Sequence, residues 1–555
     1  MPRTHDAGRP PAFAGLGVDA INQYKDAAAT ARSLNHMPSL LSSDPSCQEP
    51  TMPSLLHAST DEEVKAEAAH FVFVPLMAQG HIIPAVDTAL LLATQGALCT
   101  IVATPSTAAR VRPTVESARR SGLPVSLVAL PLDYAAVGLP DGLPGGADNL
   151  DNVPLEYMLA YFSAVALLRE PIETHLRDHA PRPPTCIVSD FCHPWTVQLA
   201  ANLGVPRLTF FSMCAFCILC QHNVERFNAY DGVLDYNQPV VVPGLEKRFE
   251  VTRAQAPGFF RGWPAWEKFA DDVERARAEA DGVIMNTFVE MEPEYVAGYA
   301  AARGMKVWTV GPVSLYHQHA ATLAARGNTA AIGADDCVRW LDDREPGSVV
   351  YVSFGSIAYA DPKQISELGL GLEASGYPFI WVVKDAGRHD EASIAFLRGL
   401  EERVAGRGLL IWGWAPQALI LSHRAAGAFV THCGWNSTLE AVAAGLPVVT
   451  WPHFTDQFLN EKLAVEVLGI GVSVGVKEPV MYRMDQKDVV VGRETVEAAV
   501  RSAMDGGEDG EERRCKARAL AVKARAAMRE GGSSHANIRD LAKFFQVGAT
   551  QGTAQ

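Results

Sequence analysis

Short apolar segments alternate with helical patterns through most of this chain of 555 residues, and this alternation constrains the fold more than any other feature. The first instance reads HFVFVPLM (70–77), then IIPAVDTALLLATQG (82–96), then ALCTIVATP (97–105). An apolar strand, a helix and a second apolar strand in this order predict a βαβ unit with parallel strands.

The pattern recurs in two series separated by the aperiodic stretch 314–334. Predicted strands of the first series continue with CIVSD (186–190), VPRLTFFS (205–212), DGVIMNTF (281–288) and VWTVGPV (307–313). Those of the second series are SVVYVSFGS (348–356), PFIWVV (378–383), GLLIWGW (408–414), AGAFVTHC (426–433) and LPVVTWP (446–452). We therefore expect an α/β fold with two facing, Rossmann-like, doubly wound domains, in which ligands lie beyond the carboxyl ends of the strands.

The same patterns predict the domain boundaries. The divisions are a disordered extension (1–66), a first domain (67–313), a linker (314–334), a second domain (335–547) and a tail (548–555). We expect the last helix of the second domain to pack back on the first. The extension is rich in Ala, Ser and Pro and lacks sustained periodicity, which is typical of disorder.

Charge and cysteine usage exclude several classes of partner. The chain carries 63 acidic and 48 basic residues, a net charge of −15, which disfavours binding to nucleic acid or to anionic membranes. Its longest apolar stretch, 208–220, is too short to cross a bilayer as a helix. Most of the ten cysteines lie in apolar runs, as reduced core thiols do. We expect a soluble, cytoplasmic, monomeric protein.

A polar turn in the second series looks like a ligand site. The segment THCGWNSTLEAVAAGLPVVTWPHFTDQ (431–457) contains no Lys or Arg, yet it places a predicted helix start, near Ser437, directly after a strand. The free N–H groups and dipole of a helix start can bind a phosphate, with His432, Asn436 and Ser437 as neutral donors. The alternative is an ordinary capping box between Ser437 and Glu440, which needs no ligand.

Side chains suited to a sugar nucleotide flank this turn. Trp414 could stack on a planar base, and Gln417 could bind polar groups beside it. Asp456 and Gln457 combine a carboxylate with an amide, which suits the vicinal hydroxyls of a sugar.

The stretch from Trp414 to Gln457 resembles the donor-binding signature of plant UDP-dependent glycosyltransferases of family 1, through W-A-P-Q, H-C-G-W-N-S-x-x-E and a closing D-Q. The flanks, including CVRWLDDREPGSVVYVSFGS, resemble the branch that acts on flavonoids, terpenoids, steroids and hormones. The resemblance implies a GT-B fold, a UDP-sugar donor and a small hydroxylated acceptor. It implies that Trp414 stacks on uracil beside the Ala415 backbone and that Gln417 and Glu440 bind the ribose. It also implies that the diphosphate is bound at the Gly434 turn by Ser356, His432, Asn436 and Ser437. The sugar would be contacted by Trp435, Asp456 and Gln457. Gln at position 457 accompanies glucose in this family, whereas His accompanies galactose.

Two residues in the first half are candidates for acid–base chemistry. His81 follows the first strand at the start of a helix, where the helix dipole favours a neutral ring. Asp190 ends a second strand, so both residues could meet at the same crevice. The alternative is a histidine satisfying a helix start and an aspartate capping the next helix. The resemblance favours catalysis, because His81 and Asp190 match the family's catalytic histidine and its partner, and it implies direct displacement with inversion.

Other motifs do not support a bound metal or redox cofactor. The cysteines of CAFCILC (214–220) lie in an apolar run without a fourth ligand at comparable spacing, and GIGVSVG (469–475) has one residue too many for a dinucleotide fingerprint. No D-x-D triplet is present. We expect no metal and no cofactor, with UDP-glucose as a co-substrate. A sugar-nucleotide-binding protein without turnover and, more distantly, an oxidoreductase are the alternatives.

Acceptor selectivity is expected from the loop 138–154 and from the helices after Asp190 and Ser212.

Overall fold

A computed structural model describes residues 67–139, 148–261, 265–317, 319–324, 326–355, 361–383, 389–479 and 491–546. The chain divides into two units, Met1–Glu63 and Val64–Gln555, and all of the described residues lie in the second unit. The predicted extension (1–66) and tail (548–555) therefore fall outside the described residues, as does Ser356. The domain boundaries stay predictions.

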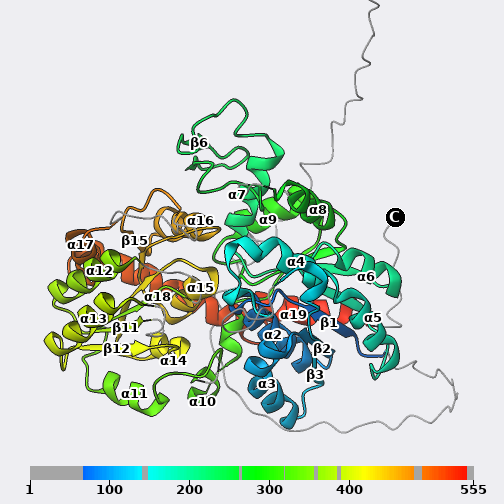
Figure 1. Cartoon of the computed structure of the whole chain (residues 1–555), viewed down its shortest axis with the longest axis horizontal. Helices are drawn as coiled ribbons and strands as arrows, with labels where there is room; N and C mark the ends of the chain where they lie inside the picture. Colours follow the sequence, from blue (N-terminus) through cyan, green and yellow to red (C-terminus); the bar gives the residue numbers. More distant parts are fainter. Residues whose placement is uncertain are drawn as a thin grey trace, which may run out of the picture. The chain divides into compact units, whose positions relative to one another are not determined.

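The first half forms a sheet of seven parallel strands in the order β3-β2-β1-β4-β5-β8-β9 (Figure 1). The strands are β1 (His70–Val74), β2 (Leu98–Ala103), β3 (Val125–Ala129), β4 (Cys186–Asp190), β5 (Arg207–Phe211), β8 (Gly282–Met285) and β9 (Val307–Thr309). The order reverses between β1 and β4, which pair directly. Such a switch point opens a crevice at the carboxyl ends of the two strands.

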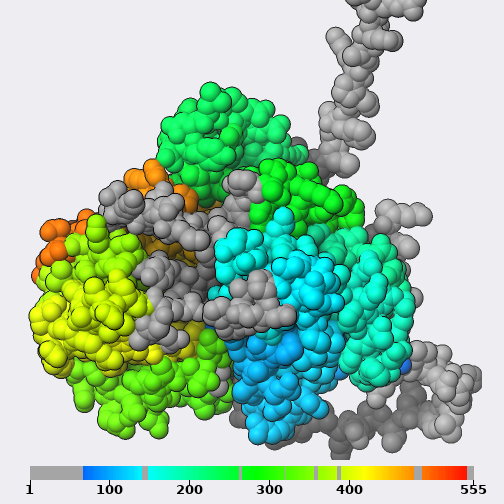
Figure 2. All heavy atoms as spheres, viewed as in Figure 1, coloured from blue at the N-terminus to red at the C-terminus, as the bar shows by residue number. Residues whose placement is uncertain are grey.

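Helices connect these strands, as parallel pairing requires. They are α2 (Gln79–Thr94), α3 (Pro105–Arg120), α4 (Met158–Ala166), α5 (Arg169–Asp178), α6 (Thr196–Leu203), α7 (Ala215–Arg226), α8 (Glu267–Ala278) and α9 (Pro293–Arg303). After α7 the chain leaves the sheet for a short antiparallel hairpin, β6 (Val240–Val241) and β7 (Glu250–Val251). This green segment projects at the top of the view in Figures 1 and 2.

The second half forms a sheet of six parallel strands in the order β12-β11-β10-β13-β14-β15. The strands are β10 (Val349–Ser353), β11 (Phe379–Val383), β12 (Gly408–Trp412), β13 (Ala426–Thr431), β14 (Val448–Thr450) and β15 (Gly471–Ser473). Its helices are α11 (Ala334–Asp342), α12 (Pro362–Ser375), α13 (Glu391–Arg403), α14 (Gln417–Ser422), α15 (Trp435–Ala444), α16 (Gln457–Lys462), α17 (Arg493–Met504) and α18 (Glu508–Met528). The switch point lies between β10 and β13, so α15 begins at the second crevice.

The predicted α/β fold with two parallel sheets is confirmed, although several details differ from the sequence analysis. The strands β3 and β15 were not predicted, and β15 lies inside the GIGVSVG segment. The helix α15 begins at Trp435, two residues before the predicted start at Ser437. The stretch 314–334, predicted as a linker, includes a short helix, α10 (Ala320–Ala324).

The final helix, α19 (Ser533–Phe544), packs against the first sheet. Asp540 Oδ2 accepts a hydrogen bond from Trp308 Nε1 at 2.7 Å, and Ser534 Oγ donates to the Gly311 carbonyl at 2.6 Å. The ring of Phe545 packs edge-on against Phe71 of β1. In Figure 1 this red helix lies beside the blue elements of the first sheet. Its residues Ile538, Leu541 and Ala542 are buried.

Within the described ranges, no helix is both long enough and apolar enough to cross a membrane. The nine cysteines of the same ranges are unpaired, and eight of them are buried. Cys214, Cys217 and Cys220 all point into the core along α7, where burial raises the pKa of each thiol.

Candidate active site

A cavity of about 400 Å³ lies at the carboxyl ends of both sheets and is lined by residues from the two halves of the chain. The first half contributes His81 and Ser212, and the second contributes Trp414, Asn436 and Gln457. Parallel sheets gather the loops that follow their strands at one edge, which is why residues so distant in sequence share one cavity.

His81 and Asp190 form a hydrogen-bonded pair in this cavity. His81 is the third residue of α2, directly after β1, and Asp190 is the last residue of the neighbouring strand β4. His81 Nδ1 lies 2.7 Å from Asp190 Oδ2, and the carboxylate also accepts from the backbone N–H of Leu76 (3.3 Å) and of Cys192 (3.1 Å). The carboxylate is fully buried, whereas 21% of the imidazole is exposed. Because Asp190 occupies Nδ1, Nε2 is the nitrogen that can accept a proton from a ligand.

Asp190 also makes His81 more basic. Burial lowers the pKa of His81, but the carboxylates of Asp190, Asp456 and Asp151 together raise it more, with Asp190 contributing most, so this pKa lies above its ordinary value of 6.5. Burial would raise the pKa of Asp190, yet His81 holds it below its ordinary value. From the sequence we expect the helix dipole to set the ionisation of His81, whereas in the structure a carboxylate lies at its Nδ1. A full charge at hydrogen-bonding distance outweighs the partial charge of a helix end.

The second crevice is built around the start of α15. Gly434 is the N-cap residue, and no side chain caps the helix there. A Cβ at Gly434 would lie 2.3 Å from His432 Nε2, and one at Gly355 would lie 2.6 Å from His432 Cε1. The imidazole of His432 is therefore held between two backbone segments that tolerate only glycine. The N–H groups of the first turn of α15 remain available for an anionic ligand.

Three residues expected to bind the nucleotide form one cluster beside this helix start. Gln417 Nε2 donates to Ser437 Oγ at 3.0 Å and to Glu440 Oε2 at 2.9 Å. Ser437 and Glu440 lie within α15 and face Gln417 rather than the helix start, so they do not form the capping box that the sequence offered as an alternative.

Trp435 and Asn436 connect α15 to the first half of the chain. Trp435 Nε1 donates to the Asn286 carbonyl at 2.7 Å, and this indole is buried. Asn436 Nδ2 donates to the Gly80 carbonyl at 2.6 Å, while its Oδ1 accepts from Asn286 Nδ2 at 3.2 Å. The helix α15, which starts at the second crevice, is thus hydrogen-bonded to Gly80, the residue that precedes His81.

Asp456 and Gln457 lie at the start of α16, where they line the cavity. Asp456 accepts from Asn460 Nδ2 at 2.7 Å and from Thr455 Oγ1 at 3.0 Å. Burial raises the pKa of Asp456 above its ordinary value, although both hydrogen bonds lower it. Gln457 Oε1 accepts from the backbone N–H of His453 at 2.8 Å, which fixes the loop before α16.

Trp414 and Ala415 follow β12 and also line the cavity. The indole of Trp414 is partly exposed, and the Trp414 carbonyl accepts from the N–H of Ala331 at 2.7 Å. Of the site residues predicted from the sequence, the structure brings together every one that it describes.

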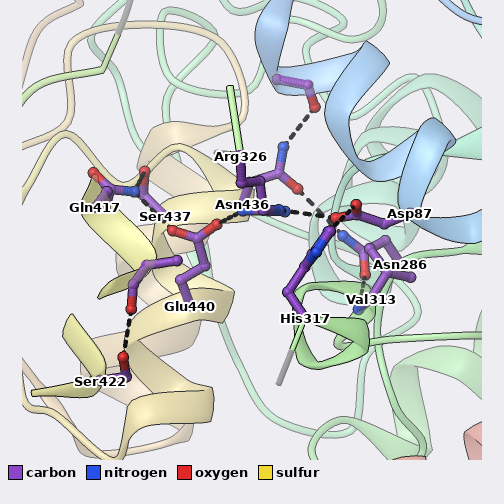
Figure 3. Close-up of polar contacts among 12 residues, drawn as sticks. Asp87, Asn286, Val313, His317, Arg326, Gln417, Ser422, Asn436, Ser437 and Glu440 are labelled. Atoms are coloured by element: carbon purple, nitrogen blue, oxygen red, sulfur yellow. Dashed lines mark hydrogen bonds and ion pairs between the residues drawn. The ribbon is translucent and has the colours of Figure 1, made fainter. Parts of the chain in front are cut away.

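Four further residues at the junction were not predicted from the sequence. Arg326 lies between Asp87 of α2 and Glu440 of α15, with His317 on the far side of Asp87, and Asn286 holds Asn436 (Figure 3). Arg326 falls in the stretch interpreted as a linker, where no strand end or helix start marks it as a site residue. The only sequence signal for Arg326 as a site residue is that it is the single Arg of the stretch 314–334 and precedes a Gly.

The part of the cavity formed by the first half is mainly apolar. Its apolar side chains are Leu76, Ile83, Leu150, Met158, Phe162, Phe191, Met213 and Phe260. Leu150 comes from the predicted loop 138–154, whose residues 140–147 lie outside the described ranges. Phe191 and Met213 directly follow Asp190 and Ser212, in the turns before α6 and α7 rather than in the helices themselves.

Known proteins match this chain along most of its length. The family model "UDP-glucoronosyl and UDP-glucosyl transferase" matches residues 340–496. UDP-glycosyltransferase 73C12 of Barbarea vulgaris is 45% identical over 481 residues, which cover 86% of this chain and 96% of that protein.

Solved structures match as well. The crystal structure of UGT73P12 from Glycyrrhiza uralensis, complexed with glycyrrhetinic acid 3-O-monoglucuronide, superposes with a TM-score of 0.78 at 36% identity, covering 86% of this chain and 96% of that one. The structure of UGT2 from Phytolacca americana, complexed with UDP-2fluoro-glucose and pterostilbene, gives a TM-score of 0.66 at 27% identity, covering 86% and 100%. The chain therefore has the GT-B fold and belongs to the plant family 1 UDP-glycosyltransferases of group 73, as a UDP-dependent hexosyltransferase.

Proposed function

We propose that this enzyme transfers glucose from UDP-glucose to a hydroxyl group of a small, apolar plant metabolite, giving a β-glucoside. The observation that carries the proposal is the contact of 2.7 Å between His81 Nδ1 and Asp190 Oδ2, in the same cavity as the start of α15. A base and an anion-binding helix start in one cavity provide the two functions that glycosyl transfer needs.

In the proposed mechanism His81 Nε2 takes the proton of the acceptor hydroxyl. The acceptor oxygen then attacks the anomeric carbon, and the bond from that carbon to the diphosphate oxygen breaks. The electron pair leaves with UDP, whose added negative charge faces the first turn of α15. Asp190 stabilises the imidazolium that forms. One displacement from the opposite face converts the α-linked donor into a β-glycoside.

The donor site follows from the cluster around α15. Trp414 provides a face for uracil, and Gln417 and Glu440 provide polar groups for the ribose. The first-turn N–H groups of α15, with His432, Asn436 and Ser437, are suited to the diphosphate. Asp456 and Gln457 line the same cavity as this site and His81, so they are suited to bind the hexose, and Gln457 favours glucose over galactose.

The acceptor site favours a flat or polycyclic apolar molecule. Its wall consists of aromatic and aliphatic side chains, and Gln79 adds a buried Oε1 that has no hydrogen-bond partner among the described residues. UGT73P12 and UGT2 are bound in their structures to glycyrrhetinic acid 3-O-monoglucuronide and to pterostilbene. We therefore propose terpenoid, steroid, hormone or flavonoid acceptors.

The test combines a variant with a product assay. His81→Ala should abolish glucoside formation while UDP still binds in calorimetry, and His179→Ala, an exposed histidine on the first half, should match the wild type. Full turnover by His81→Ala would overturn the assignment of the base. Wild type should be run with UDP-glucose, UDP-galactose and UDP-glucuronate over a panel of terpenoids, flavonoids and hormones. An α-linked product, seen in the anomeric coupling constant, would refute inversion.

A further inference from the structure

We propose that Arg326 is a positioning residue for the donor: its ion pair holds the Glu440 carboxylate aimed at the ribose, and it connects that carboxylate to the helix that carries His81. The proposal rests on the proposed function, in which Glu440 binds the ribose hydroxyls. It adds a residue from the connecting stretch to the donor site.

The contacts of Arg326 span both halves of the chain. Its Nε donates to Asp87 Oδ2 of α2 at 2.9 Å, and its Nη1 forms a short ion pair with Glu440 Oε1 of α15. The other oxygen of Asp87 lies 2.7 Å from His317 Nε2. Figure 3 shows Arg326 between the helix of Asp87 and the helix of Glu440.

The charges make Arg326 necessary to this arrangement. The side chains of Asp87, Arg326 and Glu440 are 2%, 9% and 7% exposed, so two carboxylates and one permanent cation are buried together. Burial would raise the pKa of Asp87, but Arg326 and His317 hold it below its ordinary value. A buried carboxylate that loses its cation takes up a proton or moves toward water. Without Arg326, Glu440 would lose the partner that fixes its Oε1.

The remaining contacts leave Glu440 able to bind a diol. Its Oε1 faces Arg326, and its Oε2 accepts from Gln417 Nε2 at 2.9 Å. An ionised carboxylate has about four acceptor positions, so each oxygen retains one for a hydroxyl. Arg326 and Gln417 together fix the orientation of the carboxylate in the cavity that all three residues line.

The residue after Arg326 fits the same interpretation. Gly327 has φ +97°, and a Cβ there would lie 2.5 Å from Trp414 Cζ2. Ala331 N–H then donates to the Trp414 carbonyl at 2.7 Å. The stretch 326–331 therefore contacts both the proposed ribose carboxylate and the proposed uracil-stacking indole.

Arg326 also connects the donor site to the catalytic helix. Asp87 lies on α2 six residues after His81, about 9 Å along the helix axis. The second attachment between α15 and α2 is the hydrogen bond from Asn436 Nδ2 to the Gly80 carbonyl. Two attachments fix the helix that carries the base relative to the helix that faces the diphosphate.

The test uses UDP and 2′-deoxy-UDP as ligands of the full-length enzyme in calorimetry. In Arg326→Gln we expect the Kd of UDP to rise by about 10- to 100-fold, the range for a buried hydrogen bond to a charged group. The Kd of 2′-deoxy-UDP should rise much less, so that the preference for UDP shrinks. The KM for UDP-glucose should rise more than kcat falls, and Arg326→Lys should restore part of the affinity.

Controls separate this inference from the proposed function. Arg339→Gln, at an exposed arginine of α11, should match the wild type. If Glu440→Ala removes the preference for UDP and Arg326→Gln does not, the role of Arg326 is refuted while the ribose site stands. If Glu440→Ala keeps the preference, the proposed donor site itself is wrong. Equal weakening of both ligands, or tighter binding of UDP, by Arg326→Gln would also overturn the inference.

A second variant covers a failure to fold. If Arg326→Gln alone is unfolded by circular dichroism, the double variant Asp87→Asn and Arg326→Gln removes the unpaired charge on α2 and still leaves Glu440 without its cation. It should show the same loss of preference for UDP over 2′-deoxy-UDP. A preserved preference in the double variant would refute the inference.

Discussion

Replacing Asp190 by Asn should lower kcat without weakening UDP binding. The change removes the negative charge that lies 2.7 Å from His81 Nδ1 but keeps the shape of the side chain. At an effective dielectric constant of about 20, two unit charges about 4 Å apart interact by about 4 kcal/mol. If the imidazole carries about half a charge in the transition state, the loss is about 2 kcal/mol. At 1.36 kcal/mol per factor of ten, kcat should fall by about 30-fold, and by about 1,000-fold for a full charge.

The pH profile provides a second measurement on the same variant. In the proposed mechanism His81 is a base only when neutral, and the neighbouring carboxylates, Asp190 first, raise its pKa above 6.5, so wild-type kcat should fall as the pH drops through that raised pKa. In Asp190→Asn the pKa of His81 falls, and the acid limb should move to lower pH.

The assay is initial-rate glucosylation across pH 5 to pH 9, with calorimetry for UDP. The matched control is Asp281→Asn, because Asp281 accepts from the Arg207 N–H at the amino end of the sheet, away from the cavity. An unchanged kcat together with an unmoved acid limb in Asp190→Asn would refute the reasoning, and so would an equal loss in Asp281→Asn.

Three further outcomes are expected. Gly327→Ala should weaken UDP binding by about tenfold in calorimetry, since the new Cβ would meet the Trp414 indole at 2.5 Å. Gly347 also has a positive φ, +68°, but a Cβ there would meet no atom within 4 Å, so an equal effect of Gly347→Ala would attribute the loss to backbone strain alone. Phe162→Ala should raise the KM of the acceptor and not that of UDP-glucose, because Phe162 lies on the apolar wall next to Phe260. An equal rise in the KM of UDP-glucose would contradict that placement. Excess EDTA should leave kcat unchanged, because the sequence lacks the D-x-D triplet of metal-bridged diphosphate sites, and loss of activity that Mg²⁺ restores would disprove this.

Much of the candidate site could be predicted because its residues lie at the ends of strands. His81 follows β1, Asp190 ends β4, and His432 follows β13, and an apolar strand followed by a helix is a local pattern that a single sequence displays. The resemblance to a known family then supplied roles for these positions. The strand β15 could not be predicted with equal success, because its three residues, Gly471 to Ser473, are few and partly exposed, and its pairing with β14 provides the order that its own sequence lacks.

The helix start at α15 shows how tertiary contacts change a local reading. Ser437 and Glu440 have the spacing of a capping box, but both side chains accept hydrogen bonds from Gln417, which follows another strand. The helix itself begins earlier, at Trp435. A capping box needs only residues that are close in sequence, whereas this cluster needs β12 and β13 to end at the same edge of the sheet.

The sequence by itself determined the two series of βαβ units, the apolar strands and the neutral turn at Asn436, because these depend on residues within a few positions of one another. Only the tertiary structure decided that Asp190 would reach His81 across 109 residues, and that Arg326 would join Asp87 to Glu440. Contacts of that separation depend on the order of the strands and on the path of the connecting stretch, and neither leaves a periodic pattern in the chain.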